Sequence, residues 1–322
     1  MDGKSLGKRK SSFKLTDTLI LFIALIVLVV IFSAIRVEFF SYDNISTMLK
    51  NMVITGILAL GLTPLMIARG LDISFGASIS FTGVLMAYLY NLGFGLPYCL
   101  ILGVVAAVLV GFINGLLIEK FDLIPIILTL GMMSILSALG LVISEGHSLS
   151  MLTDQLYYFA TKTFLKIPIA LFILIVFIII FWFILTFTKV GRTIYIIGAN
   201  PKVATLSGIK VQKVRILLYT FMGLVAGVAS IVMVAMTGVG NPLAGAKMSL
   251  PVLSAVVLGG ISLAGGAGSV WGTIIGVLIV SVIFNGLSVI NVPSYFIQVF
   301  QGLALILIVS LYEVRNQRAA RR

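Results

Sequence analysis

Residues 164–186 of the chain read FLKIPIALFILIVFIIIFWFILT, and Lys166 is the one charged residue among them. The run exceeds the roughly 20 residues that a helix needs to cross the hydrocarbon core of a bilayer. In lipid every backbone polar group needs an internal partner, and a helix supplies one. The stretch therefore predicts a membrane-spanning α-helix.

Similar apolar runs recur along the whole chain. Of its 322 residues, 60% are apolar and 10% are charged, and the mean hydropathy is +1.21. Soluble domains have about 45–50% apolar and about 25% charged residues, so a soluble globular domain is excluded. We expect an all-α polytopic membrane protein of about ten transmembrane helices, at residues 18–35, 48–68, 73–90, 96–118, 124–143, 164–186, 216–236, 250–263, 270–290 and 294–312. The eighth of these spans is the shortest and ends in glycines.

The basic residues predict the orientation of the chain. Most of the 22 fall in segments that are cytoplasmic if the N-terminus is inside, and the exceptions are Arg36, Lys50, Lys162, Lys166 and Lys247. By the positive-inside rule, both termini are expected in the cytoplasm. The first apolar run is too long for a cleavable signal peptide and is interpreted as a retained helix. The expected organisation is a basic tail at residues 1–17, one transmembrane domain at 18–312 with a cytoplasmic loop at 188–215, and a basic tail at 313–322.

The charged and reactive residues exclude several functions. The net charge is +12, and the basic residues flank apolar spans. We therefore expect them to face the anionic membrane surface rather than nucleic acid. A single cysteine, Cys99, and a single histidine, His147, do not suggest a metal site. All ten acidic residues lie at or beyond the ends of the expected spans, which argues against an ion-coupled carrier, because such carriers keep an ionisable group at mid-membrane.

The longest cytoplasmic connection predicts a short surface helix. Asn200 followed by Pro201 is a favourable N-cap and first-turn pair. Val203, Leu206 and Ile209 recur every three residues and form one apolar stripe, and Gly208 is expected to end the helix. Such a helix either lies on the lipid surface or inserts into a groove of a soluble partner.

The same connection carries a resemblance. Residues 191–209 read GRTIYIIGANPKVATLSGI, which is similar to the cytoplasmic coupling-loop signature of the membrane subunits of ABC importers for simple sugars, the ribose, xylose and galactose type permeases. Pro201 and Lys202 stand where many members have an acidic residue. The resemblance assigns ATPase coupling to Gly191, Arg192, Tyr195, Gly198, Asn200, Ala204, Ser207, Gly208 and Ile209. Ile197 also matches the signature.

Two further segments resemble motifs of that family. Residues 68–78, ARGLDISFGAS, are similar to its G-G-I-D-L-S-V-G-S, with Arg69 in place of a glycine. This motif, interpreted as a gate contact or as a helix cap formed by the Asp72 carboxylate, contributes Arg69, Gly70, Asp72, Ser74 and Gly76. Residues 255–273, AVVLGGISLAGGAGSVWGT, resemble its glycine-rich motif. This segment predicts a broken helix through Gly259, Gly260, Gly265, Gly266 and Gly268, with close helix packing at Gly272 and Gly276 as the alternative.

The resemblance implies a non-catalytic translocation subunit. The glycine-rich segment lacks the G-K-[ST] of a phosphate-binding loop, so ATP and Mg²⁺ are expected on a separate ATPase subunit and no cofactor on this chain. An extracytoplasmic binding protein, a second permease copy and the plasma membrane of a bacterium complete the expected setting. The expected cargo is a ribose-like pentose or a hexose, with a nucleoside, a furanosyl signalling molecule or, from another class, an ion-coupled carrier as alternatives. Candidate substrate-path residues are Asn114, Ser134, Asn241 and Asn285.

Overall fold

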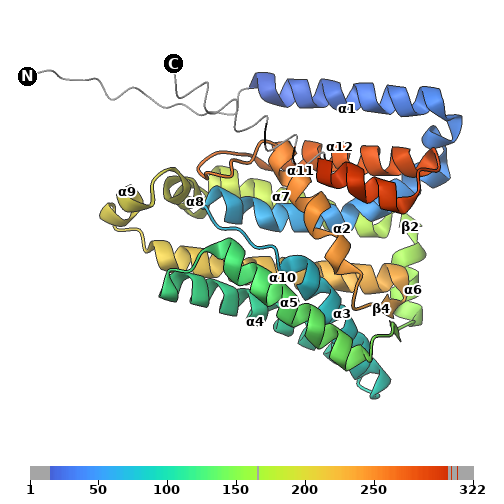
Figure 1. The fold of residues 1–322 in the computed structure, drawn as a ribbon, viewed down its shortest axis with the longest axis horizontal. Helices are drawn as coiled ribbons and strands as arrows, with labels where there is room; N and C mark the ends of the chain where they lie inside the picture. The colour runs from blue at the N-terminus through green and yellow to red at the C-terminus, as the bar shows by residue number, and fades with distance from the viewer. Residues whose placement is uncertain (1–14, 165–166, 304–305, 307–309, 311–322) are drawn as a thin grey trace, which may run out of the picture.

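The computed structural model describes residues 15–164, 167–303, 306 and 310 (Figure 1). The chain folds almost entirely into helices, which confirms the all-α class. The longer ones are α1 (Leu15–Ile35), α2 (Tyr42–Ile67), α3 (Phe75–Asn91), α4 (Leu96–Phe121), α5 (Pro125–Ser144), α7 (Ile169–Phe187), α10 (Val211–Thr237) and α12 (Val270–Val289). The shorter ones are η1 (Val37–Phe40), α6 (Asp154–Thr161), α8 (Lys189–Ala199), α9 (Pro201–Leu206), η2 (Gly245–Lys247) and α11 (Ser249–Leu258), and residues 294–303 are also helical.

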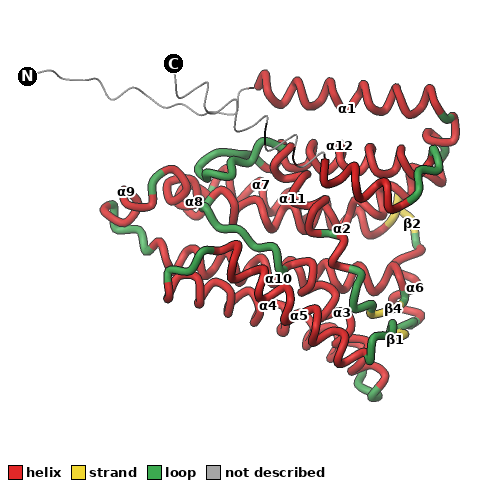
Figure 2. Tube along the Cα trace, viewed as in Figure 1, coloured by secondary structure: helices red, strands yellow, loops and turns green. Residues whose placement is uncertain are grey.

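The long helices run side by side between two distinct ends. Helices α8 and α9 lie at one end and α6 at the other (Figure 1), and we name these the α8–α9 end and the α6 end. The strands are two-residue pieces near the α6 end (Figure 2). Strand β1 (Leu149–Ser150) pairs antiparallel with β4 (Val239–Gly240), and β2 (Thr163–Phe164) pairs antiparallel with β3 (Ile167–Pro168).

Helices α2 and α10 form the centre of the bundle. Their most apolar windows are 56% and 61% buried, against 17% for α5 and 22% for α7. The low burial of α5 and α7, together with their apolar sequences, marks faces that suit lipid contact. Helix α4 packs closely on α10, because Gly111 on α4 faces Gly223 on α10 and a Cβ added to Gly111 would lie 3.0 Å from the Gly223 nitrogen.

Local sequence explains where several helices begin and end. Helices α4, α5 and α9 each have a proline in their first turn, where the missing N–H costs nothing. The hydroxyl groups of Ser41, Thr153, Thr188 and Ser269 accept hydrogen bonds from backbone N–H groups at the starts of α2, α6, α8 and α12. These caps satisfy donors that otherwise have no partner in the helix.

The structure contains six helices that are long and apolar enough to cross a membrane among the described residues: α2, α4, α5, α7, α10 and α12. Helix α3 is a shorter helix of 17 residues, and residues 19–35 of α1 form a shorter apolar helix. The last expected span, at residues 294–312, lies partly outside the described residues, as do the tail at 313–322 and most of the tail at 1–17.

The predicted eighth span, at residues 250–263, is wrong at its end. Helix α11 stops at Leu258 after 10 residues, and a non-helical loop runs from Gly259 to Ser269 before α12 begins. Gly260 ends the helix in a left-handed conformation, with φ +84°. A helix of 10 residues spans about 15 Å, half of a bilayer core. Helix α11 is therefore a half-helix.

The segment between α10 and α11 also differs from the prediction, which placed it outside the membrane. Gly240 lies against Gly83 of α3, and Gly245 lies against Gly76, seven residues closer to the α3 start. Residues 238–248 therefore run back along α3 into the bundle. Irregular backbone at this depth is tolerated where protein buries it.

Candidate functional site

Three segments that are far apart in the sequence meet at the α8–α9 end. The turn after α2, the end of α8 and the loop between α11 and α12 approach one another there (Figure 1). We call this meeting point the junction and define it as residues 67–69, 195–199 and 265–268. Each of its three segments belongs to one of the three sequence motifs.

Arg69 joins the first segment of the junction to the second. Its Nε donates to the carbonyl oxygen of Gly198 at 2.6 Å, and its Nη2 donates to that of Ala199 at 3.0 Å. These carbonyls end α8, where a cation is favourable because the helix dipole is negative there. Arg69 has φ +66°, a left-handed conformation that is unfavourable for a residue with a side chain. The glycine that the family motif has at this position adopts it freely.

The backbones of all three segments touch in the junction. The N–H of Gly266 donates to the Ile67 carbonyl at 2.8 Å, and Gly266 has φ +77°. Gly198 faces both groups, and a Cβ on it would overlap the Ile67 carbonyl oxygen and the Gly266 nitrogen. A glycine is therefore required at residue 198 for this contact.

Tyr195 forms the second link between α8 and the glycine-rich loop. Its hydroxyl group donates to the Gly268 carbonyl at 2.9 Å. Burial raises the pKa of this phenol above its usual value, so the hydroxyl group keeps its proton and remains a donor at neutral pH.

Helix α9 projects from the bundle beside the junction. The Asn200 Oδ1 accepts from the N–H groups of Lys202 and Val203 at 3.0 and 3.2 Å, which confirms the predicted N-cap. Gly208 follows the helix with φ +81°. The apolar stripe is not buried, because Val203 is 50% exposed and Leu206 is 88% exposed.

The other predicted coupling residues hold α8 and α9 in place or face solvent. Gly191 donates its N–H to the Thr188 hydroxyl, and Ala204 is the fully buried residue of α9. Arg192 and Ser207 are exposed, and Ile209 is half-buried.

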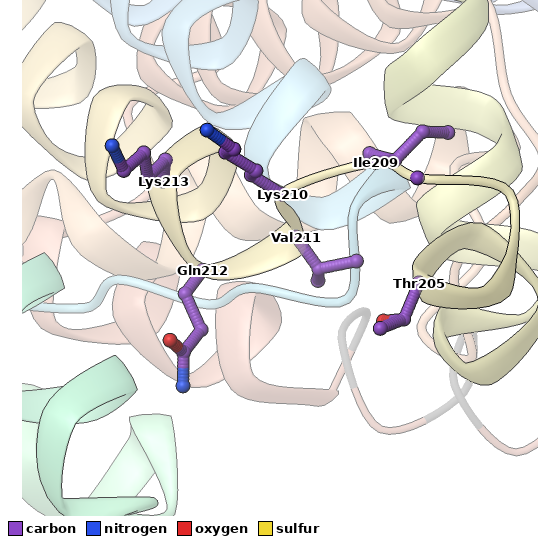
Figure 3. Close-up of a pocket in the computed structure, with 7 residues that line it drawn as sticks. Thr205, Ile209, Lys210, Val211, Gln212 and Lys213 are labelled. Carbon is purple, nitrogen blue, oxygen red and sulfur yellow. The ribbon is translucent and has the colours of Figure 1, made fainter.

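A hollow of about 570 Å³ lies between α9 and the start of α10. Its lining residues are Thr205, Gly208, Ile209, Lys210, Val211, Gln212 and Lys213. Figure 3 shows the Lys210 and Lys213 side chains extending to the same side of this segment, away from the Gln212 side chain. Neither lysine forms an ion pair within the described residues, where the one ion pair joins Arg215 to Glu119 at 3.4 Å. The hollow is therefore lined by two lysines that have no acidic partner among the described residues.

The chain between α2 and α3 is held by polar groups inside the bundle. Asp72 is 3% exposed, and its Oδ1 accepts from the N–H and the hydroxyl group of Ser74 at 2.7 and 2.6 Å. Asn114, from α4, donates to the Ser74 hydroxyl at 2.9 Å. Asp72 lies beyond the ends of α2 and α3, as predicted, but it is buried in the protein.

Helix α10 fixes the same segment from its other side. The Tyr219 hydroxyl group lies 3.2 Å from the Leu71 nitrogen and 3.3 Å from the Leu71 oxygen, and the Arg215 Nε donates to the Ala68 carbonyl at 3.1 Å. Gly70 donates its N–H to the Leu65 carbonyl. Gly76 starts α3 in direct contact with Gly245.

The glycine-rich segment shows both predicted features. It breaks the helix between Gly259 and Ser269, and Gly259 and Ala255 of α11 also pack against Gly272 and Gly276 of α12. Gly260, Gly265, Gly266 and Gly268 all have positive φ.

The four candidate substrate-path residues do not form one site. Asn114 is bound to Ser74, Asn241 accepts from the Leu243 N–H in a local turn, and Asn285 pairs with Asn44 near the α6 end. Ser134 is exposed on α5, where its hydroxyl group donates to the Leu130 carbonyl. The four side chains therefore bond to separate partners, and the Asn114 Oδ1 is buried without a hydrogen-bond partner among the described residues.

Sequence reasoning missed Gly245, Arg215 and Tyr219, which hold the motif segments in place. A buried tyrosine within a predicted span is a signal for Tyr219, because its hydroxyl group needs a partner. Gly245 has no comparable signal. Within the described residues, no group of three His, Cys, Asp or Glu side chains is placed to hold a metal ion.

Comparison with known proteins places the chain among transport proteins. The model of the family described as "Branched-chain amino acid transport system / permease component" matches residues 44–309. A ribose import permease protein of Bacillus subtilis (strain 168) is 35% identical over 292 residues, which cover 90% of this chain and 91% of that protein. No solved structure matches.

Two other relatives have similar coverage. A ribose import permease protein of Escherichia coli (strain K12) is 32% identical, over 89% of this chain and 91% of its own length. An autoinducer 2 import system permease protein of Escherichia coli (strain SMS-3-5 / SECEC) is 31% identical, over 88% of each chain.

Proposed function

We propose that this chain, which belongs to the family of branched-chain amino acid transport system permease components, is the translocation subunit of an ATP-driven importer of a simple sugar. Two of the relatives described above are named as ribose import permeases, so a ribose-like pentose or a hexose is the first candidate cargo. A third is named as an autoinducer 2 import permease. This name makes a furanosyl signalling molecule the second candidate.

The observation that carries this proposal is the exposure of α9. Leu206 is 88% exposed on a helix that is separate from the six long apolar spans. An exposed apolar pair on a short helix suits insertion into the groove of a soluble partner. We assign that groove to a separate ATPase subunit, which binds ATP and Mg²⁺ and has the catalytic role.

The charge around α9 indicates what kind of groove this is. Lys202, Lys210 and Lys213 are exposed and unpaired within the described residues. The sequence has no acidic residue between Asp154 and Glu313, so this half of the chain supplies no acidic partner for them. The ATPase groove is accordingly expected to have an acidic rim, which would also speed association.

The junction provides a route for movement from α9 into the membrane. Arg69, Tyr195 and Gly266 connect α8 to the turn before α3 and to the loop after α11. A displacement of α8 and α9 by the ATPase would therefore move the half-helix α11 and the start of α3. The start of α3 contacts η2, the short helix that precedes α11, through Gly76 and Gly245.

The proposed topology has ten crossings, with both termini in the cytoplasm of a bacterium and the subunit in its plasma membrane. Supporting this, the predicted cytoplasmic connections at residues 69–72, 119–123 and 188–215 meet at the α8–α9 end. An extracytoplasmic binding protein would deliver the sugar at the α6 end. Two permease copies would enclose the path between them.

ATP hydrolysis in proteoliposomes tests this function. The vesicles contain this chain, its ATPase and its binding protein, with a panel of monosaccharides, nucleosides and amino acids. We expect one sugar to stimulate hydrolysis and uptake, and Leu206→Asp to abolish the stimulation. Leu123→Asp is the matched control, because Leu123 is an exposed apolar residue between α4 and α5 that does not line the hollow. Uptake by this chain alone, driven by an ion gradient, would instead establish a secondary carrier.

A further inference from the structure

Lys247 lies near the middle of the bundle's length, although its sequence position suggests an outer loop. It ends η2, directly before α11. Helix α11 runs antiparallel to α12, with Gly259 against Gly272 and Ala255 against Gly276. Continuing that pairing places Ser249 level with residue 282, about 18 Å along α12 from its start at the α8–α9 end.

Contacts with α3 give a second and shallower value for this depth. The Gly245 N–H donates to the Ser80 hydroxyl at 2.7 Å, so η2 lies beside the first two turns of α3. The residue before α3, Ser74, is bound to Asn114, which lies five residues, or about 7.5 Å, before the ion-paired Glu119 on α4. Together these positions place η2 roughly 10–15 Å from the charged α8–α9 end.

The Lys247 side chain is exposed at this depth. It forms no ion pair within the part of the chain that the structure describes. Asp72 is buried in a hydrogen-bonded cluster, and Glu119 pairs with Arg215. The other acidic residues with described surroundings, such as Asp122, Glu145 and Asp154, lie at the ends of helices. Within the residues that the structure describes, a second copy of this chain therefore offers no carboxylate at the level of Lys247.

Lipid is not a suitable environment for this ammonium group. Faces that suit lipid look different at mid-depth: α7 exposes Val176, Ile179 and Phe183 there. An ionised side chain near the bilayer centre is strongly unfavourable unless it faces water or protein, and such residues mark substrate pathways. Water is the remaining environment for Lys247.

We infer that Lys247 lines the water-filled substrate path and donates hydrogen bonds to the hydroxyl groups of the solute. The inference rests on the proposed function, in which two copies enclose that path. Ser134, exposed on α5 about 13 Å from the start of that helix, lies at a similar depth, and both α5 and η2 pack against α3. A fixed positive charge here selects uncharged or anionic polyhydroxylated solutes and disfavours cationic ones.

Water access is tested by cysteine labelling. Cys99 is the single cysteine and is buried, so Cys99→Ala gives the background. In proteoliposomes, Lys247→Cys is expected to react with an anionic, membrane-impermeant methanethiosulfonate at least tenfold faster than Ile179→Cys. Ile179 is the comparison because it is exposed on the lipid-facing side of α7. D-ribose, or whichever monosaccharide stimulates the ATPase, should slow the reaction. Equal rates for the two variants, or no protection by sugar, would overturn the assignment.

Transport by charge variants tests the selectivity. Lys247→Met keeps the length of the side chain but removes the charge, and uptake of the neutral sugar is expected to fall roughly tenfold, because a charge-assisted hydrogen bond is lost. Lys247→Arg should retain most of the uptake. Relative to the neutral sugar, uptake of a cationic amino sugar should rise in Lys247→Met. An unchanged ratio contradicts the inference.

The two proposals fail in different ways. Labelling of Lys247→Cys needs no ATPase, so it reports on the path even if ATP does not drive transport. If the complex transports sugar with ATP but Lys247→Cys remains unreactive, only the inference about Lys247 is overturned. If uptake is independent of the ATPase, the proposed function is overturned and the labelling result still stands.

Discussion

The hydroxyl group of Tyr195 donates a hydrogen bond of 2.9 Å to the carbonyl oxygen of Gly268, 73 residues later in the chain. This bond joins the coupling segment to the loop between α11 and α12. Together with the Arg69 contacts, it makes the junction a connected unit. The following predictions concern the junction and the surface beside it.

Tyr195→Phe removes this bond and keeps the ring. We expect a loss of about 1 kcal/mol in the free energy of unfolding, together with weaker coupling of hydrolysis to uptake. The raised pKa means that the bond contributes a constant amount below the ordinary tyrosine pKa of about 10 and changes only above it. Thermal unfolding between pH 6 and 9 should therefore show a constant difference between Tyr195→Phe and the wild type. A difference that disappears across this range would contradict the assignment.

Arg69→Ala and Arg69→Gly separate the backbone strain at this residue from its hydrogen bonds. Both variants lose the bonds to Gly198 and Ala199, but alanine keeps the unfavourable φ of +66° and glycine does not. Arg69→Ala is expected to be less stable than Arg69→Gly by about 1 kcal/mol. Denaturation in detergent micelles measures the difference, and equal stability of the two variants would show that the turn relaxes.

Gly198→Ala places a methyl group against the Ile67 carbonyl and the Gly266 nitrogen. We expect destabilisation of about 1–3 kcal/mol and a strong reduction of sugar-stimulated hydrolysis, because the junction must open. Gly131→Ala on α5 is the control, since a Cβ there meets no atom within 4 Å. Normal coupling in Gly198→Ala would show that the junction does not transmit the movement.

Salt should weaken the association with the ATPase. The double variant Lys210→Glu and Lys213→Glu is expected to bind the ATPase about tenfold more weakly at low salt, because two rim charges are reversed. Its affinity should also depend less on salt. Lys120→Glu is the control, because Lys120 is exposed in the last turn of α4 and does not line the hollow. Identical salt curves for the double variant and Lys120→Glu would show that the hollow does not contact the ATPase.

Local patterns in the sequence predicted several details of the site. Asn200 and Pro201 predict the start of α9, and Gly208, the glycine predicted to end the helix, follows its last turn. The glycine-rich motif predicted the break before α12. These features depend on the preferences of a few neighbouring residues, such as a side-chain cap or a positive φ, and so are encoded where they occur.

Two segments show where such patterns fail. Hydropathy extends the eighth span to residue 263, because Ile261 and Leu263 are apolar, although α11 ends at Leu258. The alternation of the spans predicts an outer loop at Lys247. A hydropathy window averages over residues and does not register that residues 238–248 turn back along α3.

The sequence by itself determined the all-α membrane class, most helix positions and the three motifs, because the period and length of apolar runs respond to a uniform solvent, the bilayer. Tertiary structure alone decided that Arg69, Gly198 and Gly266 meet, that Asp72 is buried and that residues 238–248 run back along α3. These relationships join residues that are far apart in the sequence or set the course of an irregular segment. They arise from close backbone packing between helices, which no local preference specifies.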